Sequence, residues 1–119
     1  MKRGFVYIIG AGPGDASLIT VKGVRCLKEA DTVIYDHLVN PRLLRHAKKE
    51  AELIFAGKKA GYHTLSQDEI NHILKEKAAE GRIVARLKGG DPFIFGRGGE
   101  EAEFLAASGI PFEVVPGIT

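Results

Sequence analysis

One glycine-rich run constrains what this chain can fold into more than any other feature of its sequence. The run extends from Lys88 to Glu101, reads KGGDPFIFGRGGEE and contains five glycines. Glycine is favoured where the backbone takes unusual angles or approaches another group closely. An apolar, strand-like segment (83–87) precedes the run, and a helix-like segment (100–107) overlaps its end. Open α/β sheets bind ligands at such strand-to-helix turns, so the run predicts both a fold class and a ligand site.

Apolar runs alternate with helical patterns along the whole chain. The expected strands are 5–9, 32–35, 52–56, 83–87 and 112–115, and the expected helices are about 20–30, a short one from Pro41, 66–81 and 98–108. This alternation predicts an α/β fold, with a five-stranded parallel sheet and crossover helices on both faces. The clearest helix start is Ser66, because Glu69 follows at the spacing of a capping box. Gly81 and Gly109 are the expected helix stops.

Length and composition exclude several classes of protein. The chain has 119 residues, enough for one domain with a buried core, and a formal net charge of +2 with interspersed signs. We therefore expect no nucleic-acid partner. No stretch approaches the roughly 18 apolar residues of a membrane span, so we expect no membrane association. A single cysteine, Cys26, excludes an internal disulfide, and the short apolar run after Met1 does not suit a secretory signal. These features are typical of a cytoplasmic protein.

One local charge imbalance allows two interpretations. Six basic residues fall within eighteen positions, against the two acids Glu50 and Glu52; the six are Arg42, Arg45, Lys48, Lys49, Lys58 and Lys59. They either form a solvated face or attract a polyanionic substrate.

The first loop, from Gly10 to Asp15, invites a dinucleotide-binding interpretation that fails on spacing. The third glycine of the G-x-G-x-x-G fingerprint should stand where this chain has Asp15. Pro13 also removes a backbone N–H from the loop that would hold a pyrophosphate. No P-loop motif occurs in the sequence, and the four histidines lack metal-ligand spacing, so we expect no bound metal.

The glycine-rich run and three further motifs together resemble one family. The other motifs are VYIIGAGPGD at 6–15, YDHLV at 35–39 and VPGIT at 115–119, in matching order and spacing. The chain is similar to the uroporphyrinogen-III C-methyltransferases, which belong to the S-adenosylmethionine-dependent tetrapyrrole methylases. The resemblance covers essentially all of residues 1–119 and implies the N-terminal domain of a two-domain enzyme. It also implies that a second, α+β domain is absent from this chain.

The resemblance assigns cofactor-binding roles to a set of matching positions. These are Pro13, Gly89, Gly90, Asp91, Ile94 and Thr119. From the residues alone, Asp91 is either an acceptor for the cofactor or the cap of a turn. Ile94 is likewise either an apolar wall for adenine or a core residue beneath the loop. Arg97 could bind a carboxylate or pair with Glu100 or Glu101.

The resemblance also names a proton acceptor, at Asp36, and a proton donor, at Lys58. Asp36 follows the second expected strand and Lys58 the third, at the edge where parallel sheets bind ligands. From the residues alone, a turn at a strand end explains Asp36 better than a catalytic role does, and Lys58 could be an exposed lysine beside Lys59.

The implied reaction is two methyl transfers from S-adenosylmethionine to uroporphyrinogen III, giving precorrin-2 by way of precorrin-1 on the route to sirohaem and cobalamin. The products would include S-adenosylhomocysteine. The tetrapyrrole carries eight carboxylates, which would account for the basic segment. We expect a homodimer for the full-length protein and little or no activity for this chain alone. The alternatives are a methylase of a later corrin intermediate and a noncatalytic binding module.

Overall fold

The computed structural model describes residues 4–57, 64–92 and 98–118. The strands are β1 (Phe5–Gly10), β2 (Thr32–Tyr35), β3 (Glu52–Phe55), β4 (Ile83–Lys88) and β5 (Phe112–Val115). The α-helices are α1 (Val21–Glu29), α2 (Gln67–Ala79) and α3 (Gly98–Ala107). Two short 3-10 helices also occur, η1 (Ala16–Leu18) and η2 (Pro41–His46). Each expected strand is present, with ends that differ from the expectation by at most one residue.

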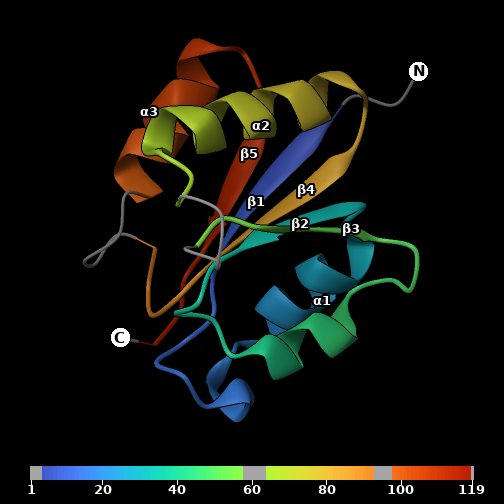
Figure 1. Cartoon of the computed structure of the whole chain (residues 1–119), viewed down its shortest axis with the longest axis vertical. Coiled ribbons are helices and arrows are strands. Elements are labelled where there is room, and N and C mark those ends of the chain that lie inside the picture. Colours follow the sequence, from blue (N-terminus) through green and yellow to red (C-terminus); the bar gives the residue numbers. More distant parts are fainter. Residues whose placement is uncertain (1–3, 58–63, 93–97, 119) are drawn as a thin grey trace.

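All five strands are parallel and lie in the order β3-β2-β4-β1-β5. Figure 1 shows α1 on one side of the sheet, with η2, and α2 and α3 on the other. The connection after β1 leads over β4 to β2, whereas the connection after β4 leads over β1 to β5. The two connections therefore leave neighbouring strands in opposite directions and on opposite faces of the sheet, which creates a switch point of the kind where α/β sheets bind ligands. The predicted fold class, with helices on both faces, is confirmed.

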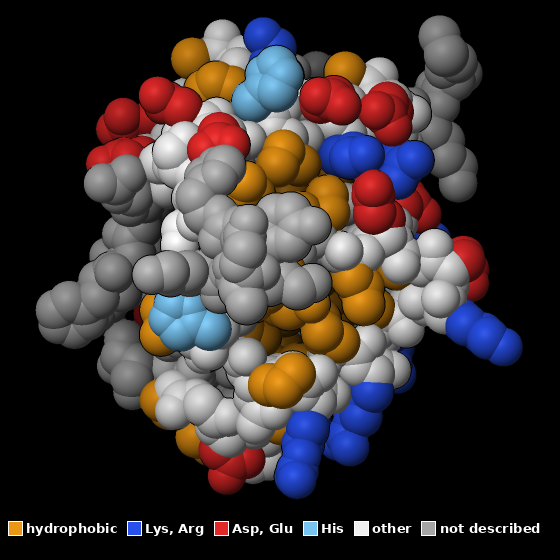
Figure 2. Space-filling view, viewed as in Figure 1, with side chains coloured by type: hydrophobic (Ala, Val, Ile, Leu, Met, Phe, Trp, Pro, Cys, Tyr) orange, Lys and Arg blue, Asp and Glu red, His pale blue; other side chains and the backbone are white. Residues whose placement is uncertain are grey.

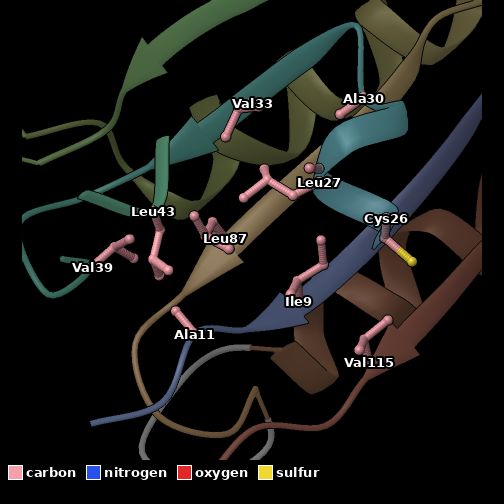
Figure 3. Close-up of a cluster of buried hydrophobic side chains, with 11 residues drawn as sticks. Ile9, Ala11, Cys26, Leu27, Ala30, Val33, Val39, Leu43, Leu87 and Val115 are labelled. Atoms are coloured by element: carbon pink, nitrogen blue, oxygen red, sulfur yellow. The ribbon is translucent and has the colours of Figure 1, made fainter. Parts of the chain in front are cut away.

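Two hydrophobic clusters fill the space between the sheet and its helices. The cluster under α1 and η2 joins Leu27 and Leu43 to Ile9 and Leu87 of the central strands, as Figure 3 shows. Cys26 belongs to it and is 5% exposed. The cluster under α2 and α3 joins Ile70, Leu74 and Leu105 to the opposite sheet face; its other members include Val6, Ile8, Ile34 and Val84.

Local sequence signals account for the helix ends. Ser66 and Glu69 form the predicted capping box, with the Ser66 hydroxyl accepting from Glu69 N–H and the Glu69 carboxylate from Ser66 N–H. Gly81 and Gly109, with φ of 82° and 71°, follow α2 and α3 as predicted. The segment from Pro41 is a 3-10 helix, and η1 was not expected. Three residues are too few to produce the apolar periodicity that predicts a helix.

The surface carries mixed charge. On the face in Figure 2, charged side chains of both signs surround a central group of hydrophobic ones. Among the described residues, no helix has the length and apolar character needed to cross a membrane.

Candidate functional site

The carboxyl ends of the strands bring several predicted site residues to one edge of the sheet. Gly10 ends β1, Lys88 ends β4, and these two residues are register partners. Asp36 follows β2, and Gly117 follows β5 after one intervening residue. Because the switch point lies between β1 and β4, the loops that follow these two strands form the centre of the candidate site.

The loops after β1 and β4 cross each other through two glycines. Gly12 and Gly90 form an antiparallel bridge, in which Gly90 N–H donates to the Gly12 carbonyl at 2.8 Å and Gly12 N–H to the Gly90 carbonyl at 3.2 Å. Ala11 N–H adds a bond to the Lys88 carbonyl at 2.7 Å. Both bridging glycines have positive φ, 83° and 66°, an angle that side chains disfavour. The crossing therefore requires glycine at both positions.

The segment after β5 packs directly on this crossing. A Cβ on Gly10 would lie 2.6 Å from the Gly117 nitrogen, and a Cβ on Gly117 would lie 2.4 Å from the Gly90 carbonyl oxygen. Three backbone segments thus meet where no side chain fits. A further bond joins them, since the Asp91 carboxylate accepts from Gly117 N–H at 3.1 Å. In this structure Asp91 therefore ties two of the three loops together.

Gly89 and Gly90 have different surroundings. A Cβ on Gly89 would lie 3.0 Å from the Leu38 Cβ, so this glycine lets the loop after β2 approach β4. Within the described part of the chain, a Cβ on Gly90 would meet only the Ile118 carbonyl oxygen, at 4.0 Å. Of the two glycines, Gly90 is the one whose main chain is open to a ligand.

Asp36 forms a turn at the end of β2. Its carboxylate accepts from Leu38 N–H at 2.9 Å, and its carbonyl accepts from Val39 N–H at 3.2 Å. The turn interpretation of Asp36 is therefore confirmed. The half-buried carboxylate nevertheless lies at the ligand edge, so the proton-acceptor role stays a prediction.

The β1 loop beyond Gly12 lies against the loop before η2. Pro13 is exposed, and the Gly14 carbonyl accepts from the Asn40 side-chain amide at 2.8 Å. Asp15 caps η1 by accepting from the N–H and the hydroxyl of Ser17, at 2.9 and 2.7 Å. These two bonds lower the pKa of Asp15. Asp15, which stands where the dinucleotide-binding fingerprint has its third glycine, thus has a structural role.

Several predicted site residues lie outside the described part of the chain. They are Lys58, Ile94, Arg97 and Thr119. The loop that contains Ile94 and Arg97 begins and ends at described residues that touch, since Gly98 N–H donates to the Pro92 carbonyl at 3.2 Å.

A buried ionic network beside the site was missed from the sequence. Glu101 of α3 is fully buried, and its carboxylate accepts from the Arg86 guanidinium at 3.0 Å and lies 3.5 Å from the Lys88 ammonium. Gln67 of α2 donates to the same carboxylate at 3.1 Å and to the Asn71 side chain at 2.9 Å. Burial, followed by the charge of Arg86, lowers the pKa of Lys88. The signal in the sequence was a cation, Arg86, inside an otherwise apolar strand.

The cations of the basic segment (42–59) differ in their surroundings. Lys48 donates to the Asp31 carboxylate at 2.7 Å, which raises the pKa of Lys48. Arg42 and Lys49 are exposed. Because Lys48 holds the chain before β3 to Asp31, only part of the segment is available to attract an anion.

Two cavities of about 530 Å³ lie away from the carboxyl edge. One is near Gly4 and Gly109 at the amino ends of the strands, and the other lies between α1 and η2. We locate the site by the switch point, since ligands of open α/β sheets bind at the carboxyl ends of the strands.

Comparison with known proteins agrees with this geometry. Residues 5–119 match the model of the Tetrapyrrole (Corrin/Porphyrin) Methylases. The chain belongs to the tetrapyrrole methylase family. It is 60% identical over 116 residues to the uroporphyrinogen-III C-methyltransferase of Methanocaldococcus jannaschii, covering 98% of this chain and 48% of that protein. The family prediction made from the four motifs is therefore confirmed.

Solved structures of relatives have the same fold. The uroporphyrin-III C-methyltransferase of Thermus thermophilus is 50% identical, with a TM-score of 0.87 over 98% of this chain and 49% of that one. A structure of the Thermus thermophilus enzyme complexed with S-adenosyl homocysteine is 48% identical, with a TM-score of 0.81 over 98% of this chain and 46% of that one. The chain thus spans about half the length of these relatives.

Proposed function

We propose that this tetrapyrrole methylase chain is the first of two domains of an enzyme that methylates uroporphyrinogen III. Two transfers from S-adenosylmethionine to pyrrole carbons would give precorrin-2 by way of precorrin-1. The observation that carries the proposal is the crossing of Gly12 and Gly90 at the switch point, with the Gly90 main chain open to a ligand. The names of the relatives and the S-adenosyl homocysteine complex of one of them support it.

The groups at this edge fit a sulfonium cofactor better than a phosphate-bearing one. A ligand can approach the main chain of Gly90 closely, because no side chain of the described residues covers it. The Asp91 carboxylate at this edge suits a cation and repels phosphates. Bound S-adenosylmethionine would supply an electrophilic methyl group and leave as the neutral S-adenosylhomocysteine. The residues proposed to hold it are Pro13, Gly89, Gly90, Asp91, Ile94 and Thr119.

The chain's own part in the reaction is to orient two reactants and to accept a proton. Positioning alone can supply roughly 7–11 kcal/mol of the barrier. Asp36 is the proposed acceptor of the proton that the methylated macrocycle loses, and the bond from Leu38 N–H fixes the orientation of its carboxylate. Lys58 is the proposed proton donor. Exposed cations such as Arg42 and Lys49 would attract the carboxylates of the substrate.

Anaerobic incubation of the full-length gene product with S-adenosylmethionine and uroporphyrinogen III tests the proposal. We expect mass spectrometry to find a product with two added methyl groups, formed about 100-fold more slowly by Asp36→Asn. We expect little or no turnover by residues 1–119 alone, since the relatives are about twice as long. Methylation of a later corrin intermediate, with uroporphyrinogen III unchanged, would contradict the proposed substrate.

A further inference from the structure

Lys88 is a buried cation at the ligand edge to which the proposed reaction gives no role. It ends β4 immediately before Gly89 and Gly90 and is 7% exposed. A buried lysine is costly unless its ammonium is paired. Among the described residues it pairs with Glu101, at 3.5 Å, and that carboxylate already accepts from Arg86 at 3.0 Å. Two cations thus share one carboxylate beside the site.

Sheet register brings a second carboxylate to Lys88. Ile34 of β2 is the register partner of Arg86 in β4, so Asp36 and Lys88, each two residues further along its chain, lie at the same edge of two neighbouring strands. Side chains two positions apart on a strand point to the same face. Arg86 and Lys88 therefore share one face of β4, and Asp36 begins the turn at the end of the neighbouring strand β2. On the other side of Lys88 the register partner is Gly10, which has no side chain.

The electrostatics of Lys88 agree with this arrangement. Burial and the charge of Arg86 lower its pKa, while Glu101 and Asp36 oppose the lowering. With Asp36 included, the four charges on this face of β4 are balanced, two cations against two carboxylates. Glu101 anchors Lys88 to α3.

We propose that Lys88 is a positioning residue for Asp36, and that its ammonium, held by Glu101, orients the Asp36 carboxylate toward the bound substrate. This rests on the proposed function, in which Asp36 accepts the proton. Lys88 acts through Asp36 and not on the cofactor. It also connects α3, which follows the glycine-rich run, to the loop after β2.

The test uses the full-length gene product and four variants. Lys88→Met keeps the length of the side chain without its charge, and Lys88→Arg keeps the charge. Asp36→Asn removes the proposed base, and the fourth variant combines Asp36→Asn with Lys88→Met. Lys22→Met is the matched control, because Lys22 pairs with Glu113 on the exposed surface of α1.

We expect Lys88→Met to lower kcat about 10-fold or more, within the range that a positioned base contributes. KM and the affinity for S-adenosylhomocysteine should stay within about 3-fold, since binding is not the step affected. Lys88→Arg should restore most of kcat, and Lys22→Met should match the wild type. In the Asp36→Asn background, Lys88→Met should cost less than about 3-fold, because coupled residues are not additive.

Three results would overturn the proposal. They are full kcat in a folded Lys88→Met protein, an equal loss of kcat with and without Asp36, and a loss of S-adenosylhomocysteine affinity in parallel with kcat. Failure of the proposed function is distinguishable, because the wild-type protein would then transfer no methyl group to uroporphyrinogen III. That result would refute the role of Lys88 together with the function on which it rests.

Discussion

Removing the charge of Glu101 should destabilise the fold strongly. Its carboxylate is fully buried, and the side chains of Arg86 and Lys88 beside it are 4% and 9% exposed. Glu101→Gln would leave two buried cations without their shared counter-ion. Breaking a buried pair from one side costs about 3–5 kcal/mol, a large part of the roughly 5–15 kcal/mol that stabilises a typical domain.

Urea unfolding of the 119-residue chain, followed by far-UV circular dichroism, measures this loss. We expect the free energy of unfolding to fall by about 3–5 kcal/mol. The matched control is Glu113→Gln, because Glu113 pairs with Lys22 at the surface, where the two side chains are 39% and 49% exposed. Such a pair contributes about 0–1 kcal/mol. A Glu101→Gln protein as stable as the Glu113→Gln protein would refute the network as a structural element.

Three further predictions concern the loops and the caps. Gly117→Ala should destabilise the chain more than Gly90→Ala in urea unfolding, because the new Cβ at position 117 would lie 2.4 Å from the Gly90 carbonyl oxygen. A Cβ at position 90 has open space, so Gly90→Ala should cost only the roughly 1–2 kcal/mol of a positive φ. Equal losses would contradict the close packing. Ser66→Ala should cost about 0.5–2 kcal/mol through loss of the capping box, and an unchanged unfolding midpoint would show that the cap contributes nothing. The bonds from Ile83 N–H and Lys48 lower the pKa of Asp31, so they stabilise the fold above the ordinary pKa of 3.8, and this stabilisation is lost as the pH falls below it. Asp31→Asn should therefore reduce the fall in stability on acidification. An identical pH profile of stability would refute this contribution.

The sequence predicted the elements of the fold but not their arrangement. Periodicity located every strand because the strands of a parallel sheet read as short apolar runs, even at the edge strand β3, where Leu53 is exposed. The capping box at Ser66 and the glycine after α2 marked that helix from both ends. The strand order was not predicted, since alternation of strands and helices is compatible with several orders of a parallel sheet.

For the site, the sequence indicated the edge but not how the loops meet there. The glycine-rich run indicated close backbone approach, and the structure contains it as the bridge between Gly12 and Gly90. Strand order decides that Gly12 is the residue that pairs with Gly90, and that Gly117 N–H donates to Asp91. Neither contact could therefore be predicted from the sequence. The pairing of Arg86 with Glu101 joins residues fifteen positions apart on different elements. No local pattern predicts such a contact.

Calorimetric titration of S-adenosylhomocysteine into the full-length gene product and two glycine variants tests the central claim most directly. Gly90→Val places a side chain at the open point of the crossing, and Gly109→Val is its control. Gly109 also has positive φ and open space, but it follows α3 at the amino-terminal edge of the sheet. We predict that the wild-type and Gly109→Val proteins bind the ligand and that Gly90→Val does not. Unchanged binding by Gly90→Val would contradict a cofactor site at the carboxyl ends of β1 and β4.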